Sequence, residues 1–121
     1  MSGEQISTVD SELHRAITVA GFAGCSRFIT LMDNPVEALF VRHALQLGHK
    51  PEVWIISRHQ LAKILKDPET AALLRRCYVH RERMPLHRFR EWCIVYADRN
   101  LSVRTDYGSP YPHIQTLTND Q

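Results

Sequence analysis

The chain has 121 residues, of which 44% are hydrophobic and 23% are charged, with a formal net charge of +2. This length and composition are typical of one globular domain and exclude a fibrous or wholly disordered chain. The small net charge excludes a protein that coats polyanions through a strong overall positive field. No apolar run reaches the roughly 20 residues that span a bilayer, and the N-terminus lacks the apolar region of a secretory signal.

We expect residues 9–107 to form a single globular domain, preceded by a flexible N-terminus at residues 1–8 and followed by a C-terminal tail at residues 108–121. Polar termini of this kind are commonly mobile. The three cysteines are far apart and odd in number, which favours free thiols in a reducing compartment over a disulfide framework. A cytoplasmic protein is therefore expected.

The N-terminal part of the domain predicts a helix followed by a strand. Apolar residues recur along one side of Val9 to Phe22, at Leu13, Ile17 and Ala20, and this spacing indicates a helix. The run from Arg27 to Met32 is short, apolar and β-capable, and an Asp-Asn-Pro sequence follows it. This pattern predicts a strand with an abrupt end.

A helix start is well specified after this strand. Asn34 can cap the helix, Pro35 suits its first position, and Glu37 is placed as the acid of a capping box. The helix is expected to run to about Leu47. More than half of its circumference is apolar, which indicates burial against a sheet or against another subunit.

The next segment predicts a strand and two further helices. The run from Glu52 to Ile56 is β-branched and aromatic, which favours a strand. Ser57 and Gln60 form a second capping box. Asp67, followed by a proline, opens a third capped helix that is expected to run towards Tyr78.

The second half of the chain predicts a hairpin. Residues 81–90 contain Pro85 and dense charge, so we interpret them as a connecting loop. The runs from Trp92 to Ala97 and from Leu101 to Tyr107 flank a three-residue turn, and they are expected to pair as antiparallel strands. The fold class is therefore α+β, a single small domain with three to four helices on one face of a mixed sheet that includes this C-terminal β-hairpin. A purely helical packing is the alternative.

The most visible functional feature is an arginine-rich segment at residues 75–90. Arginine and aromatic residues are enriched at the hot spots of protein interfaces, and they also bind nucleic acids through phosphate contacts and base stacking. A solvated loop whose arginines pair with nearby acids is the other interpretation. The residues that we predict to bind a partner are Tyr78, Arg81, Arg83, Arg88, Phe89, Arg90 and Trp92.

The sequence assembles no recognisable reaction centre, so we assign no catalytic residue, no metal ligand and no cofactor. The seven histidines lack the spacing that converges on one ion. Cys25 follows glycines, as a nucleophile on a tight turn would, but the sequence brings no base to it. We interpret Cys25 as a turn residue, and Cys77 and Cys93 as small core residues.

The sequence therefore favours a small non-enzymatic regulatory or accessory protein that binds a protein partner, as a homodimer, through apolar surface rimmed by arginines. The first alternative is a nucleic-acid-binding protein that uses the arginines of residues 75–90. The second is a small enzyme that depends on cysteine and histidine. Salt separates the first two hypotheses, because phosphate contacts weaken steeply as ionic strength rises.

Overall fold

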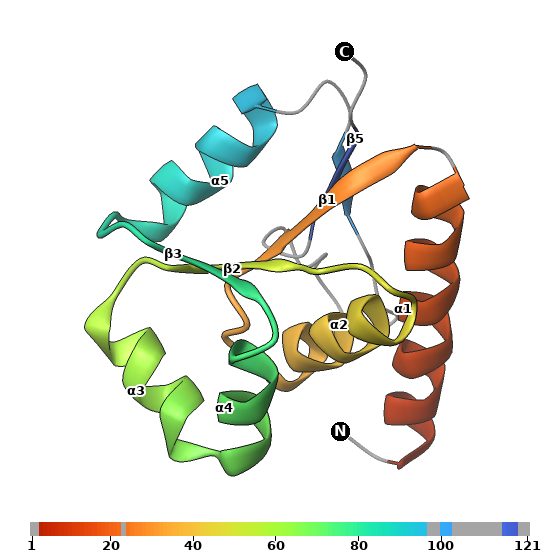
Figure 1. The fold of residues 1–121 in the computed structure, drawn as a ribbon, viewed down its shortest axis with the longest axis horizontal. Coiled ribbons are helices and arrows are strands. Elements are labelled where there is room, and N and C mark those ends of the chain that lie inside the picture. The colour runs from red at the N-terminus through yellow and green to blue at the C-terminus, as the bar shows by residue number, and fades with distance from the viewer. Residues whose placement is uncertain (1–2, 23, 97–99, 103–114, 119–121) are drawn as a thin grey trace.

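The computed structural model describes residues 3–22, 24–96, 100–102 and 115–118, which form five helices and five strands (Figure 1). The helices are α1 (Gly3–Phe22), α2 (Pro35–Gln46), α3 (Arg58–Lys66), α4 (Pro68–Leu74) and α5 (Leu86–Tyr96). The strands are β1 (Cys25–Thr30), β2 (Glu52–Ile55), β3 (Tyr78–Arg81), β4 (Asn100–Ser102) and β5 (Gln115–Thr118). None of the helices in these ranges has the length and hydropathy needed to cross a bilayer.

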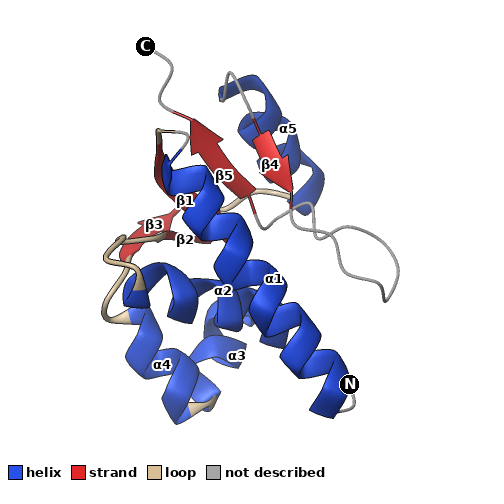
Figure 2. Ribbon diagram, turned by 90° about the vertical axis from the view of Figure 1, so that its right-hand side faces the viewer, coloured by secondary structure: helices blue, strands red, loops and turns tan. Residues whose placement is uncertain are grey.

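The strands form one sheet in the order β3-β2-β1-β5-β4. Strands β1, β2 and β3 are parallel, so that Thr30 lies opposite Val53 and Trp54 lies opposite His80. Strand β5 is antiparallel to β1, and β4 lies alongside β5 in the antiparallel sense (Figure 2). The expected mixed α+β class is confirmed, and a purely helical packing is excluded.

The helix starts that the sequence specified are confirmed. At α2, the Asn34 side chain accepts a hydrogen bond from the backbone N–H of Glu37, while the Glu37 carboxylate accepts from the backbone N–H of Asp33 and from the Asn34 amide. At α3, the Ser57 side chain accepts from the backbone N–H of Gln60, and at α4, the Asp67 side chain accepts from the backbone N–H of Glu69. These bonds satisfy backbone donors that a helix start leaves without partners.

The sheet has an apolar cluster on each face, because successive side chains of a strand point to opposite faces. Phe28 and Val53 lie on the face covered by α1, α2, α3 and α4. Ile29 and Trp54 lie on the opposite face, where α5 packs (Figure 1). Helices therefore cover both faces, and the expectation that they lie on one face is wrong.

The predicted C-terminal hairpin is also wrong, because its first strand, from Trp92, belongs to α5. In its second strand, Leu101 pairs with Thr116 of β5 instead, and residues 97–99 and 103–107 lie outside the described residues. The run that begins at Trp92 is rich in strand-forming residues, but the helix places Phe89 and Trp92 together against the sheet. Burial of this face outweighs the weak preference of the isolated run for a strand.

Other boundaries differ from those expected. Residues 81–90 are not a loop throughout, since β3 ends at Arg81 and α5 begins at Leu86, directly after Pro85. The third capped helix ends at Leu74, and Tyr78 begins β3. Helix α1 begins at Gly3, and the segment from Gln115 to Thr118 forms β5.

Candidate functional site

Four of the seven residues predicted to bind a partner are exposed, and two of these four lie on β3, the outer strand of the sheet (Figure 1). Tyr78 and Arg81 are the two ends of β3, Arg83 lies in the loop after it, and Arg88 is on α5. The exposed fraction of Tyr78 is 55%. Lys50 adds a further positive charge, since its Nζ atom lies 4.2 Å from the centre of the Tyr78 ring.

The other three residues predicted to bind a partner are less exposed, and all of them belong to α5. Phe89 is completely buried, with its ring 6.2 Å from that of Trp54, and it is therefore a core residue. Trp92 is half-buried, and its ring lies 4.4 Å from the Trp54 ring. Arg90 is half-buried, and its Nε atom has no hydrogen-bond partner among the described residues.

The apolar surface of α2 was the other candidate for a partner interface. Val36, Phe40, Val41 and Ala44 are buried in the core cluster that α2 shares with α1 and the sheet. Most of this surface is therefore covered within one copy of the chain. Leu39 is partly exposed and lines a groove described below.

Strand β3 has an open backbone edge. It pairs with β2 on one side, and no other described strand pairs with its second side. The N–H of Tyr78 donates to the carbonyl of Pro51, and the N–H of Glu82 donates to the carbonyl of Ile55. Since alternate residues of a strand bond to the same neighbour, the backbone groups of Val79 and Arg81 face the open edge.

A charged cluster that the sequence reading missed links the three parallel strands. Glu52 of β2 accepts hydrogen bonds from Arg27 of β1, at 2.6 and 2.7 Å. On its other side, Glu52 Oε1 lies 3.0 Å from Nε2 of His80 on β3. His80 also stacks on Trp54, with the ring centres 4.6 Å apart. These residues are far apart in sequence, so only the register of the strands brings them together.

The electrostatics of Glu52 indicate an anchoring role. Its exposed fraction is 8%, and burial alone would raise its pKa. The hydrogen bonds and charge of Arg27, with a further contribution from His80, outweigh burial and hold the pKa of Glu52 below its usual value. A carboxyl with a lowered pKa is ionised at neutral pH and poorly matched to general acid or base catalysis.

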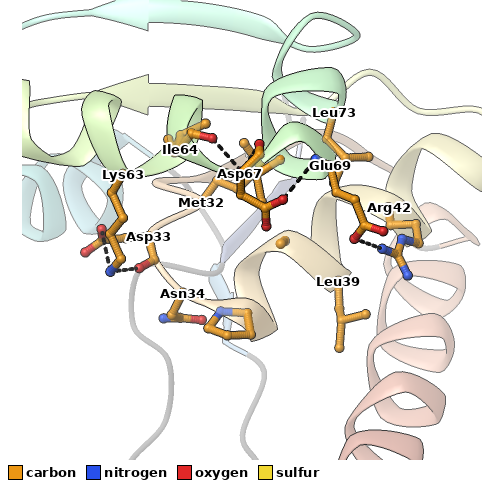
Figure 3. A pocket seen from close by; sticks show the side chains of 13 residues that line it. Met32, Asp33, Asn34, Leu39, Arg42, Lys63, Ile64, Asp67, Glu69 and Leu73 are labelled. Carbon is orange, nitrogen blue, oxygen red and sulfur yellow. Dashed lines mark hydrogen bonds and ion pairs between the residues drawn. The ribbon is translucent and has the colours of Figure 1, made fainter.

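A groove lies at the carboxyl end of β1, between the first turns of α2 and the junction of α3 with α4 (Figure 3). Its volume is about 440 Å³. At one end, Lys63 donates to the backbone carbonyl of Asp33 at 2.7 Å and lies 3.6 Å from its carboxylate. At the other end, Arg42 lies 3.6 Å from the carboxylate of Glu69.

The backbone beside this groove is held in an unusual conformation. Met32 has a φ of 51°, which is the left-handed region that a long side chain rarely occupies. The N–H of Met32 donates to Oγ1 of Thr30, which helps to hold this turn. Strained backbone of this kind persists where the surrounding structure fixes it, and such positions cluster at functional sites.

The residues considered as metal ligands or nucleophiles are placed as follows by the described part of the chain. The described residues contain no group of three or more histidine, cysteine, aspartate or glutamate side chains that would hold a metal ion. Strand β1 begins at Cys25, so its backbone belongs to a strand rather than to a turn, and its side chain lies outside the described part. Cys77 is buried, as expected for a core residue, and burial raises its pKa to about 11.

Similarity to other proteins does not assign a role to the strand edge or to the groove. No model of a protein family, no curated protein and no solved structure matches the chain.

Proposed function

We propose that the chain is a small non-enzymatic regulatory or accessory protein that binds an acidic, extended segment of a protein partner along the open edge of β3. The observation that supports this proposal is the exposure of that edge. Val79 and Arg81 direct backbone donors and acceptors outwards, and the side chains of Tyr78 and Val79 are 55% and 42% exposed. An extended peptide adds to such an edge through main-chain hydrogen bonds, and its side chains provide specificity.

The charges around β3 favour an acidic partner. Arginines precede the strand, end it and follow it, and Glu82 is the acid among them. The exposed arginines at the end of this strand and after it are Arg81, Arg83 and Arg88. Complementary charge accelerates association and disfavours basic competitors, so an acidic segment is the best match for this edge.

A homodimer through β3 is the main alternative occupant. Pairing of β3 with the same strand of a second copy would use the same backbone groups. It would also bring Arg81 and Arg83 of both copies into one interface, and like charges across paired strands are destabilising. A partner of opposite charge is therefore the better match for this edge. The homodimer remains a prediction, as does the cytoplasmic location.

Nucleic acid is a second candidate partner, because the same exposed arginines would bind phosphates. Of the three aromatic residues predicted to contribute, Phe89 is buried, Trp92 is half-buried against Trp54, and Tyr78 is exposed. One exposed ring gives a limited platform for the stacking that single-stranded nucleic acids require. We therefore rank nucleic acid below a protein segment.

The test is affinity capture from nuclease-treated lysate of the source cells with the wild type and two variants. Val79→Pro removes a donor that faces the open edge and leaves the hydrogen bonds to β2 in place. Leu65→Ala is the control, since it alters an exposed apolar residue on α3. We expect a protein that binds the wild type and Leu65→Ala, at low and at high salt, but does not bind Val79→Pro.

Two results would count against the proposal, provided that circular dichroism shows Val79→Pro to be folded. Retention of the partner by Val79→Pro would exclude strand addition at β3. Capture of nucleic acid without nuclease treatment, lost at high salt and lost in Arg81→Ala, would favour the second candidate. Sedimentation of the purified chain tests the homodimer separately.

A further inference from the structure

The groove between α2 and the α3–α4 junction has the position and size of a ligand site. It lies outside the carboxyl end of β1, and open sheets with parallel strands bind ligands at this end. Its volume of about 440 Å³ falls within the range of roughly 300–1,000 Å³ that small-molecule sites occupy. It is separate from the edge of β3, so an inference about it does not depend on the proposed function.

Most residues that line the groove are apolar, although the carboxylate of Asp67, which caps α4, also lies among them (Figure 3). Met32, Pro35, Leu39, Ile64 and Leu73 all line it. Leu39 and Leu73 are only partly buried although they pack against the core. Burial of such surface is favourable, so an apolar body placed between Leu39 and Leu73 would be stabilised.

One end of the groove carries excess positive charge. A second hollow of about 270 Å³ continues the groove and shares Arg42, Glu69 and Leu73 with it. Arg76 also lines this hollow, which therefore has two arginines and one carboxylate. The pair between Arg42 and Glu69 is exposed and 3.6 Å long, and such a pair is weak. Arg42 can therefore exchange Glu69 for an anionic ligand at little cost.

The opposite end is less suited to an anion. Lys63 is held there by two contacts with Asp33, one of them a hydrogen bond of 2.7 Å to the backbone carbonyl (Figure 3). The Asp33 carboxylate on the same side would repel a second anion. The charge along the groove therefore orients a ligand, with its apolar part in the middle and its anionic group towards Arg42.

We propose that this groove binds a small amphipathic anion, whose apolar body lies between Leu39 and Leu73 and whose carboxylate, sulfonate or phosphate group contacts Arg42 and Arg76. The planar guanidinium groups of two arginines match the oxygens of such an anion. The ligand class follows from the apolar lining and from the two arginines at one end. A neutral apolar molecule of the same shape would lack the contacts with the two arginines.

Two fluorescent probes of the same skeleton test this proposal. The first, 8-anilinonaphthalene-1-sulfonate, has an aromatic body and an anionic group, and the second, N-phenyl-1-naphthylamine, lacks the sulfonate. We expect the folded wild type to bind one molecule of the sulfonate about tenfold more tightly than the neutral probe, as charged hydrogen bonds suggest. The double variant Arg42→Ala/Arg76→Ala should lose this preference and keep its affinity for the neutral probe.

The control variant is Arg83→Ala/Arg88→Ala, which also removes two exposed arginines but leaves the groove unchanged. Its preference for the sulfonate should equal that of the wild type. Ala38→Phe, which fills the groove from α2, should block both probes while circular dichroism shows a folded chain. Equal affinity of the wild type for the two probes, no binding of either, or equal loss in both double variants would each overturn the proposal.

Discussion

Glu52 and Arg27 form a two-point ion pair between adjacent parallel strands. The Nε atom and a terminal nitrogen of Arg27 each donate to a different oxygen of Glu52, at 2.6 and 2.7 Å. Glu52 is buried and Arg27 is partly exposed. Because a pair with two parallel hydrogen bonds fixes orientation as well as adding energy, the pair fixes β1 against β2 at the amino end of β2.

We expect Glu52→Gln to lower the free energy of unfolding by about 2 kcal/mol, because hydrogen bonds to charged groups contribute roughly 1.5–3 kcal/mol. Partial exposure of Arg27 keeps the loss below that of a fully buried pair. The matched control is Glu69→Gln, whose pair with Arg42 is exposed and should contribute less than about 0.5 kcal/mol. Urea unfolding measures both, and equal losses would contradict a special role for Glu52.

The same pair predicts a dependence of stability on pH. The pKa of Glu52 is lower in the folded chain than its usual value, so the unfolded chain takes up a proton more readily. The stability that this group contributes is therefore present above about pH 4.5 and is lost as the pH falls through the folded pKa. Thermal unfolding between neutral and acidic pH should show the wild type losing its advantage over Glu52→Gln, and a constant difference would contradict the linkage.

We expect replacement of Gln60 to lower the free energy of unfolding by more than Glu52→Gln does. The Gln60 side chain is buried, accepts from the N–H of Ile56, and donates to the carbonyls of Leu31 and Trp54. Replacement by alanine leaves three buried backbone groups without this partner, so we expect Gln60→Ala to cost about 3 kcal/mol. Gln46→Ala, at an exposed position of α2, should change stability by less than about 0.5 kcal/mol, and a similar effect of both variants would refute this account.

Asparagine and aspartate are usually equivalent as helix caps. We expect position 34 to be an exception. The Asn34 amide donates to the Glu37 carboxylate, whereas aspartate would place a second negative charge there. We expect Asn34→Ala to lower the free energy of unfolding by about 1 kcal/mol. Asn34→Asp should be at least as destabilising at neutral pH and should recover in acid. Greater stability of Asn34→Asp than of Asn34→Ala at neutral pH would contradict this prediction.

We expect the thiol of Cys77 to react slowly with alkylating reagents in the folded chain. Burial raises its pKa to about 11, and its Sγ atom contacts the backbone carbonyl of Leu73 at 3.2 Å. Since the thiolate is the reactive form, iodoacetamide at pH 8 should label Cys77 slowly in the folded chain and rapidly in urea. Mass spectrometry of the peptide that contains Cys77 measures this, and rapid labelling without urea would contradict the buried state.

The sequence by itself determined the local features of the first half. Asn34, Ser57 and Asp67 each start a helix where expected, because a cap depends on residues within one turn. The strand from Glu52 was also predictable, since its run of β-branched and aromatic residues is buried on both faces of a sheet. These elements imply the mixed class of the fold.

The tertiary structure decided what local pattern leaves open. The run that begins at Trp92 suits a strand by composition, but packing of Phe89 and Trp92 against the sheet makes it part of α5. Phe89 and Trp92 are three residues apart, a spacing that places both on one side of a helix, and a proline at position 85 suits a helix start. These two features were the available signals for α5.

The candidate sites depend on the tertiary structure most of all. Arg27 and Glu52 are 25 residues apart in the chain, and they meet because parallel strands lie in a particular register. The open edge of β3 and the groove beside α2 likewise arise from the order of strands and the packing of helices. A sequence specifies a residue's neighbours along the chain directly, whereas contacts across the sheet exist only when burial of the whole core fixes the register.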